Sequence, residues 1–197
     1  MNKTTLRGGP VLNLFTWFLL PAYTLLFAGS VEWFDTNFSV IAVTGKDHYR
    51  GFFLWGVLAG LVFGVLLVRI IHALPGKWGK LPLYLLTYLA LSAMAYTLMI
   101  PYLPESWPGW ASLHVALAAG SCVLVMVTIL WILVRRCCRD LPTWRGCLLF
   151  WGFTVAGAAL LFLMAGMVSS ALEVFFTLTV DGLLRRMFLL SCPRSGR

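Results

Sequence analysis

The chain has 197 residues, of which 60% are hydrophobic and only 11% are charged, and its formal net charge is +8. Soluble domains carry about 25% charged residues, so this composition excludes an ordinary water-soluble domain and indicates a protein surrounded by lipid. In a soluble protein the positive charge would point to nucleic acid. In a membrane protein it is typical of basic loops on the cytoplasmic side. We therefore expect membrane lipids as partners, a membrane protein as a possible second partner, and no nucleic acid.

The apolar segments predict the helices in chain order. A spanning helix needs about 20 mostly apolar residues. Four segments meet this requirement, at about 10–28, 51–74, 81–100 and 110–134. The last apolar block, 146–184, is longer than one span, and small, flexible residues occupy its middle at 164–170. We read it as two helices, at about 147–164 and 168–184; one long tilted helix is the alternative.

The distribution of Lys and Arg decides between these alternatives. With six passes, the inside segments carry Lys3, Arg7, Arg69, Lys77, Lys80, Arg135, Arg136, Arg139, Arg145, Arg185, Arg186, Arg194 and Arg197. The outside segments carry only Lys46 and Arg50. A five-pass chain would export Arg185 and Arg186, against the positive-inside rule. The sequence predicts an all-α, single-domain integral membrane bundle of six transmembrane helices over 1–197, with cytoplasmic N- and C-termini.

The N-terminal segment also resembles a signal peptide, with Lys3 and Arg7 before an apolar core. Signal-peptide cores are usually about 7 to 15 residues long, and this one is nearer a full span. We therefore keep it as the first helix of a multi-pass protein and expect a bacterial plasma membrane as its location.

The predicted outside loop, 30–50, is the longest segment between the helices. Its run 37–43 is too apolar for a solvated linker, so we expect it to pack onto the bundle. Asp47, His48 and Arg50 then lead into the second helix. An adjacent Asp and His are able to bind a metal or move protons. Charges at a helix start are more often capping groups or headgroup contacts, and we favour that interpretation.

Glu173 and His114 are ionisable residues predicted to lie within spans, at a similar outward depth. Such residues are costly in hydrocarbon and normally face the bundle or a watery cavity. His114 is the expected partner of Glu173, with Arg50 or Lys46 as alternatives. The pair acts either as a polar clamp between helices or as part of a cavity that opens outward.

Two other patterns have structural interpretations. Asp181 and Arg185 have the i,i+4 spacing of a helix-surface ion pair, near the inner end of the last helix. Gly56, Gly60 and Gly64 recur every four residues, which lets another helix approach closely. We expect this ridge to pack within the bundle.

The juxtamembrane pair Cys137 and Cys138 lacks the additional ligands that a metal site requires. Palmitoylation is an alternative in eukaryotes, and reduced thiols are the favoured interpretation. We predict no cofactor and no metal.

Three places resemble the family of the damage-regulated autophagy modulators and their FGF-receptor-activating-protein relatives. They are the first outside loop with Ser39-Val40-Ile41 and Thr44-Gly45 before Arg50-Gly51-Phe52-Phe53, His114, and Ser170-Ala171-Leu172-Glu173. The chain is also similar to small membrane proteins of gut Firmicutes. Family members usually carry a proline pair before the second helix, where this chain has Lys46-Asp47-His48. The resemblance implies a non-enzymatic membrane protein that influences lipid organisation or membrane traffic.

The leading functional prediction is a non-catalytic integral membrane protein with an outward-facing polar patch of Glu173, His114, Asp47, His48 and Arg50. This patch binds or organises lipid or a membrane partner. A small proton- or cation-coupled transporter or channel subunit that uses Glu173 is the first alternative. A membrane enzyme acting on lipid through Asp47, His48 and Glu173 is the second.

Overall fold

The computed structural model describes residues 9–29, 32–44, 47–76 and 79–191, and the regular structure in these ranges is entirely helical. The elements are α1 (Pro10–Leu14), the π-helix η2 (Phe15–Leu19), α2 (Leu20–Ala28), α3 (Phe38–Thr44), α4 (His48–His72), α5 (Leu81–Met99), α6 (Pro108–Cys137), α7 (Leu141–Ala165) and α8 (Ser170–Ser191). α1, η2 and α2 follow one another without a break, and we call Pro10–Ala28 the first helix.

Five helices in this part of the chain are long and apolar enough to cross a membrane: the first helix, α4, α5, α6 and α7. α8 is long enough as well, but it carries Glu173, Asp181, Arg185 and Arg186. These charges distinguish it from the other five. α7 and α8 are separate helices, joined where Gly166 adopts a left-handed conformation with φ 66°.

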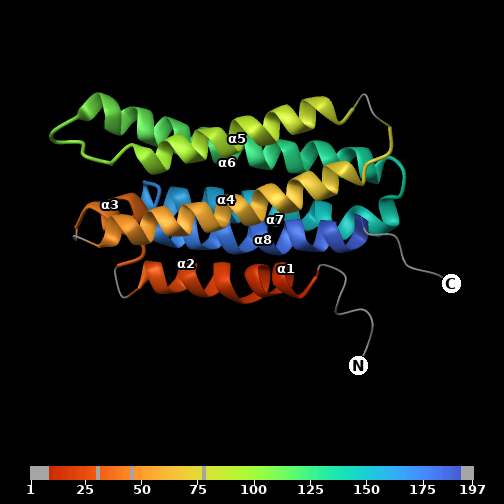
Figure 1. The fold of residues 1–197 in the computed structure, drawn as a ribbon, viewed down its shortest axis with the longest axis horizontal. Helices are drawn as coiled ribbons and strands as arrows, with labels where there is room; N and C mark the ends of the chain where they lie inside the picture. Colours follow the sequence, from red (N-terminus) through yellow and green to blue (C-terminus); the bar gives the residue numbers. More distant parts are fainter. Residues whose placement is uncertain (1–8, 30–31, 45–46, 77–78, 192–197) are drawn as a thin grey trace.

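The long helices form a ring in which each packs on the next along the chain, and α8 returns to the first helix. α4 also packs directly on α8. Figure 1 shows that α1 begins and α8 ends at the same end of the bundle. The opposite end carries α3, the α5–α6 connection and the α7–α8 turn, and we call it the α3 end.

The end where α1 begins is basic, and we call it the basic end. Among the described residues it carries Arg69, Lys80, Arg135, Arg136, Arg139, Arg145 and Arg186, at or near helix termini. In the same ranges only Arg50 has a comparable position at the α3 end. The predicted inside residues Lys3, Arg7, Lys77, Arg194 and Arg197, and the predicted outside residue Lys46, lie outside the described residues. The described basic residues therefore have the one-sided distribution that the sequence predicts.

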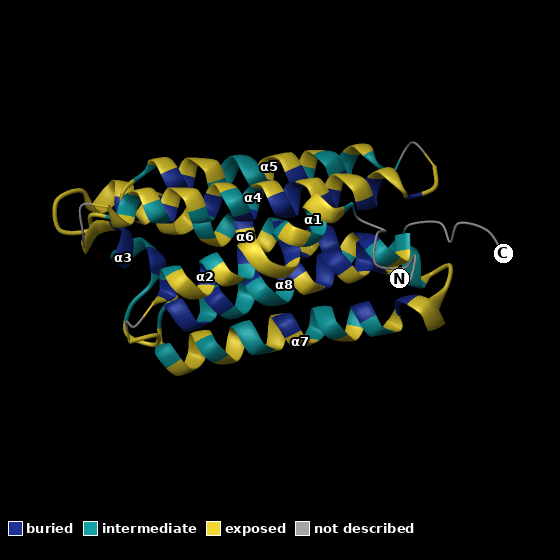
Figure 2. Ribbon diagram, turned by 60° about the horizontal axis from the view of Figure 1, so that its bottom comes forward, coloured by how far each residue is buried: buried dark blue, intermediate teal, exposed yellow. Residues whose placement is uncertain are grey.

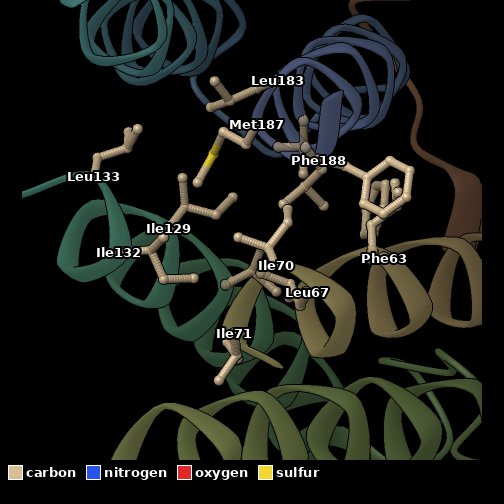
Figure 3. Close-up of a cluster of buried hydrophobic side chains, with 14 of the residues drawn as sticks. Phe63, Leu67, Ile70, Ile71, Ile129, Ile132, Leu133, Leu183, Met187 and Phe188 are labelled. Carbon is tan, nitrogen blue, oxygen red and sulfur yellow. The ribbon is translucent and has the colours of Figure 1, made fainter. Parts of the chain in front are cut away.

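The main apolar core lies between α4, α6 and α8 in the half of the bundle towards the basic end (Figure 3). Its fully buried side chains include Leu67, Ile70, Ile129, Leu183 and Met187. α7 is more peripheral, and Figure 2 shows exposed residues along most of its length. An apolar exposed face of this kind is expected where lipid replaces water as the solvent.

The glycine ridge of α4 faces α5. A Cβ atom at Gly56, Gly60 or Gly64 would meet the side chains of Leu98, Met94 and Leu91 respectively. Small residues allow such close approach, and packing contacts then hold the two helices together. The ridge is used inside the bundle, as the sequence predicts.

Replacing Gly60 by Leu should lower the free energy of unfolding by about 1–3 kcal/mol, because the new side chain must displace Met94 and separate α4 from α5. Thermal unfolding in detergent measures the loss. Gly120→Leu is the matched control, since a Cβ at Gly120 in α6 meets no atom within 4 Å. Equal losses in the two variants would show that the ridge is not a packing surface.

A π-helical turn interrupts the first helix at Phe15–Leu19. Pro21 follows it and has no N–H group, so an α-helical hydrogen bond to the carbonyl four residues earlier cannot form. The backbone N–H of Leu20 instead donates to the carbonyl of Phe15. The turn presents Thr16 to the bundle, where its side chain is buried, while Trp17 is exposed. Single π-helical turns are frequent at functional sites.

Candidate functional site

The predicted outside loop folds back onto the α3 end of the bundle through α3. Phe38, Ile41 and Ala42 of α3 are buried. The ring of Phe38 makes edge-to-face contacts with Phe27 at 5.1 Å and with Trp55 at 4.8 Å between ring centroids. The expectation that the apolar run 37–43 packs onto the bundle is met.

Two side chains bind the free N–H groups at the start of α3. The first N–H groups of a helix have no partner within the helix, so other groups must accept from them. Oδ1 of Asn37 accepts a hydrogen bond from the backbone N–H of Val40 at 2.9 Å, as an N-cap residue does. Oε2 of Glu173 accepts one from the backbone N–H of Phe38 at 2.6 Å. Glu173 thus fixes the start of α3 from α8, although the two residues are far apart in sequence.

The segment that precedes α3 in turn caps the start of α8. The backbone N–H of Ser170 donates to the carbonyl of Thr36 at 2.7 Å, and that of Ala171 donates to the carbonyl of Trp33 at 2.9 Å. The start of α8 and the start of α3 therefore supply each other's missing hydrogen bonds. We call this arrangement the reciprocal cap.

His114 of α6 holds α3 from a second direction. Its Nε2 lies 2.8 Å from Oγ of Ser39, and its Nδ1 lies 2.7 Å from the carbonyl oxygen of Ile100. Because a carbonyl oxygen only accepts, the proton is assigned to Nδ1. In the neutral ring Nε2 then accepts from the Ser39 hydroxyl. The imidazole is buried and links α3 to the end of α5 through α6.

Glu173 and His114 are therefore not bonded to each other as the sequence analysis expected. Each binds α3 instead, at the adjacent residues Phe38 and Ser39. The alternative partners differ too: Arg50 forms an exposed ion pair with Asp47 at 3.7 Å, and Lys46 lies outside the described residues.

The remaining patch candidates follow α3 in the chain. Nδ1 of His48 lies 3.2 Å from the carbonyl oxygen of Ile41. Ile41 follows Phe38, whose N–H binds Glu173, by about one helical turn, and none of the hydrogen bonds or ion pairs of Asp47 or His48 among the described residues reaches the Glu173 carboxylate. An enzyme needs acid and base groups within hydrogen-bond reach. In the described part of the chain, these three candidates make no such pair.

Two recesses open along the α5–α6 connection at the α3 end, and the smaller is also lined by α3. The larger, about 380 Å³ in volume, is lined by Met99, Ile100, Pro101, Leu103, Trp107 and Trp110. The smaller, about 270 Å³, is lined by Val40, Val43, Tyr102, Leu103, Pro104, Glu105 and Ser106. Leu103 lines both, so they are adjacent. Their walls are mainly apolar, and Tyr102, Glu105 and Ser106 bring hydroxyl and carboxyl groups to the smaller recess. We call this surface the α3-end recess.

Sequence reasoning missed Ser39 as the partner of His114 and the role of the α5–α6 connection in the recess. Asn37 was identifiable, because Asn directly before an apolar run is an N-cap signal. Ser39 and the connection carry no comparable local signal. Their roles depend on which helices are neighbours in space.

Among the described residues no group of three or more His, Cys, Asp or Glu side chains is arranged to hold a metal ion. Cys137 and Cys138 are free thiols. Comparison of the chain with protein-family models, curated proteins and solved structures found no match. The resemblance to the autophagy modulators therefore rests on the residues quoted for it above.

Proposed function

We propose that this chain is a non-catalytic integral membrane protein that binds lipid through the α3-end recess. It crosses a bacterial plasma membrane six times, with the basic end and both termini in the cytoplasm, because Lys and Arg are retained on that side. α8 provides the sixth pass. Its 22 residues span about 33 Å, and its mid-helix charges Asp181 and Arg185 are buried inside the bundle.

The α3-end recess is the main evidence for lipid binding. An apolar hollow with a few polar groups at one side is the usual form of a small-molecule site. Met99, Ile100 and Leu103 offer contacts for an acyl chain, and Glu105 and Ser106 offer hydrogen bonds to a headgroup. The exposed Trp107 and Trp110 are residues that favour the membrane–water interface.

The hydrogen bonds of the site support a binding role rather than a catalytic one. Glu173 and His114 are occupied by Phe38, Ser39 and Ile100, which they hold in place. In this proposal they shape the wall of the recess that α3 provides. The patch predicted from the sequence thus becomes a support for the lipid site, with Asp47, His48 and Arg50 outside it.

Leu103→Asn should weaken lipid binding about tenfold, because one apolar side chain contributes about 1.5 kcal/mol of contact and 1.4 kcal/mol is a factor of ten. The protein is purified in mild detergent, and the phospholipid it retains is counted by native mass spectrometry. Leu103 is exposed, so the thermal midpoint should not change.

Leu163→Asn is the matched control, because Leu163 is an exposed residue of α7 near the same end of the bundle and lines neither recess. Retained lipid should be unaffected there. The proposal is wrong if both variants retain as much lipid as the wild type, or if both lose it equally.

Proton- or cation-coupled transport is a second candidate, and one observation favours it. α8 carries Glu173, Thr177, Asp181 and Arg185 at intervals of four residues, so that polar side chains recur along one side of the helix. Ionisable residues within spans often mark ion or proton paths. The first helix and α5 contribute no Asp, Glu, Lys or Arg to such a path.

A further inference from the structure

Asp181 and Arg185 of α8 lie deep inside the bundle. Asp181 is about 16 Å from Ser170 and about 15 Å from Ser191 along the helix axis, so it sits midway between the two ends. Asp181 is 3% exposed and Arg185 is 8% exposed. The sequence analysis expected a helix-surface ion pair near the inner end of the helix, and that expectation was wrong. The first helix, α4 and α7 pack on α8.

Arg185 is directed to the first helix rather than to Asp181. Its Nη1 donates to Oγ1 of Thr16 at 3.0 Å, and its guanidinium lies over the ring of Trp17, with 5.1 Å between Cζ and the ring centroid. Both contacts involve the π-helical turn. Nε of Arg185 is buried and has no hydrogen-bond partner among the described residues. In these ranges no ion pair within 4.0 Å joins Asp181 and Arg185.

One carboxylate oxygen of Asp181 lacks a hydrogen-bond donor among the described residues. Its Oδ1 is buried and has no partner in the described part of the chain. Arg185 is the only charged group of the described residues that interacts with it; the first helix (with η2), α4 and α7, which pack on α8, present none to it. A charged carboxylate that lacks a hydrogen bond is strongly disfavoured in a dry interior.

Three partners are able to neutralise the charge of this carboxylate: the guanidinium of Arg185, a metal cation or a proton. Arg185 is bonded to Thr16 instead. A metal cation would be repelled by the adjacent guanidinium. A proton neutralises the carboxyl group without a further ligand and leaves Arg185 free to hold Thr16.

We propose that Asp181 is a proton-binding site and that its proton decides which partner Arg185 holds. With the proton bound, Arg185 binds Thr16 and docks the first helix on α8, as in the structure. When the proton leaves for solvent, the carboxylate attracts the guanidinium, which turns away from Thr16 so that its Nε pairs with Oδ1 of Asp181 and the hydrogen bond from Nη1 to Thr16 breaks. The first helix then moves away from α8. This site is independent of the α3-end recess.

The test is the distance between the first helix and α8 as a function of pH. Spin labels are placed at Val11 and Leu190, which are exposed on these two helices near the basic end. The full-length protein, with its other cysteines replaced, is reconstituted in nanodiscs and measured by pulsed electron resonance. Between about pH 5 and pH 9, the range that buried carboxyl groups reach, a longer distance should appear as the pH rises. A distance that does not change over this range overturns the proposal.

Asp181→Asn imitates the protonated carboxyl group and should keep the short distance at every pH. Glu173→Gln is the matched control, because it removes the other acid of α8, and it should keep the pH dependence of the wild type. If the distance in Asp181→Asn changes with pH as it does in the wild type, the proposal is overturned. If Asp181→Asn does not fold, Thr16→Val tests the proposal instead. Loss of the hydroxyl removes the hydrogen bond to Arg185 and should give the long distance even at low pH. A short distance in Thr16→Val would contradict the proposal.

Discussion

Phe38→Ala should lower the free energy of unfolding by about 3–5 kcal/mol, the range for removal of a buried aromatic ring from a packed core. Phe38 is 0% exposed and is the only residue of α3 among the largest fully buried side chains of the described chain. Its ring packs edge-to-face on Phe27 of the first helix and Trp55 of α4. Its removal leaves a cavity where three elements meet, and α3 loses its anchor.

Chemical or thermal unfolding in detergent measures this loss. Phe34→Ala is the matched control, because Phe34 lies in the same loop and is 45% exposed; its effect should stay within about 0.5 kcal/mol. Phe38→Ala should also reduce lipid retention, since Val40 and Val43 of α3 line the smaller recess. A stable Phe38→Ala variant would mean that α3 is not anchored on the bundle through this ring.

Glu173→Ala should cost about 1–3 kcal/mol of stability, the cost of leaving a buried hydrogen-bond donor without its acceptor. The substitution leaves the backbone N–H of Phe38 without its acceptor at 2.6 Å. Glu173→Gln should cost less, because the amide oxygen of glutamine still accepts from that N–H. The difference in the free energy of unfolding between the two variants therefore measures the contribution of the Glu173–Phe38 hydrogen bond.

Glu105→Ala controls for the loss of an acidic residue at the α3 end, because Glu105 is exposed. Its thermal midpoint should match that of the wild type. If Glu173→Ala and Glu173→Gln are equally destabilised, an acceptor oxygen at this position is not enough to hold the start of α3. If both are as stable as the wild type but lose lipid binding, Glu173 contacts the ligand and the clamp is not its role.

The glycine ridge and the loop that becomes α3 show which features could be predicted before the structure was known. The ridge is visible because its four-residue spacing matches one turn of the helix. The packing of 37–43 is visible because an apolar run has a cost in water wherever it lies. Both inferences need only the residues of one segment and its solvent.

The polar contacts could not be predicted in the same way. Glu173 and His114 have the right depth to meet, but α3 lies between them and takes both hydrogen bonds. The helix expected to end near residue 184 continues to Ser191. Arg185, which the sequence places at a water boundary, is buried against Thr16 and Trp17. A side chain's partner depends on the rotation and order of helices, which no single segment specifies.

The sequence by itself determined the helical class, the approximate position of the long helices, and the one-sided distribution of the described basic residues, because each follows from local composition in a lipid solvent. The tertiary structure alone decided that Glu173 caps α3, that His114 holds Ser39, and that Asp181 has an oxygen without a partner. Those contacts join residues from different helices. They exist only once the ring of helices has closed and placed them side by side.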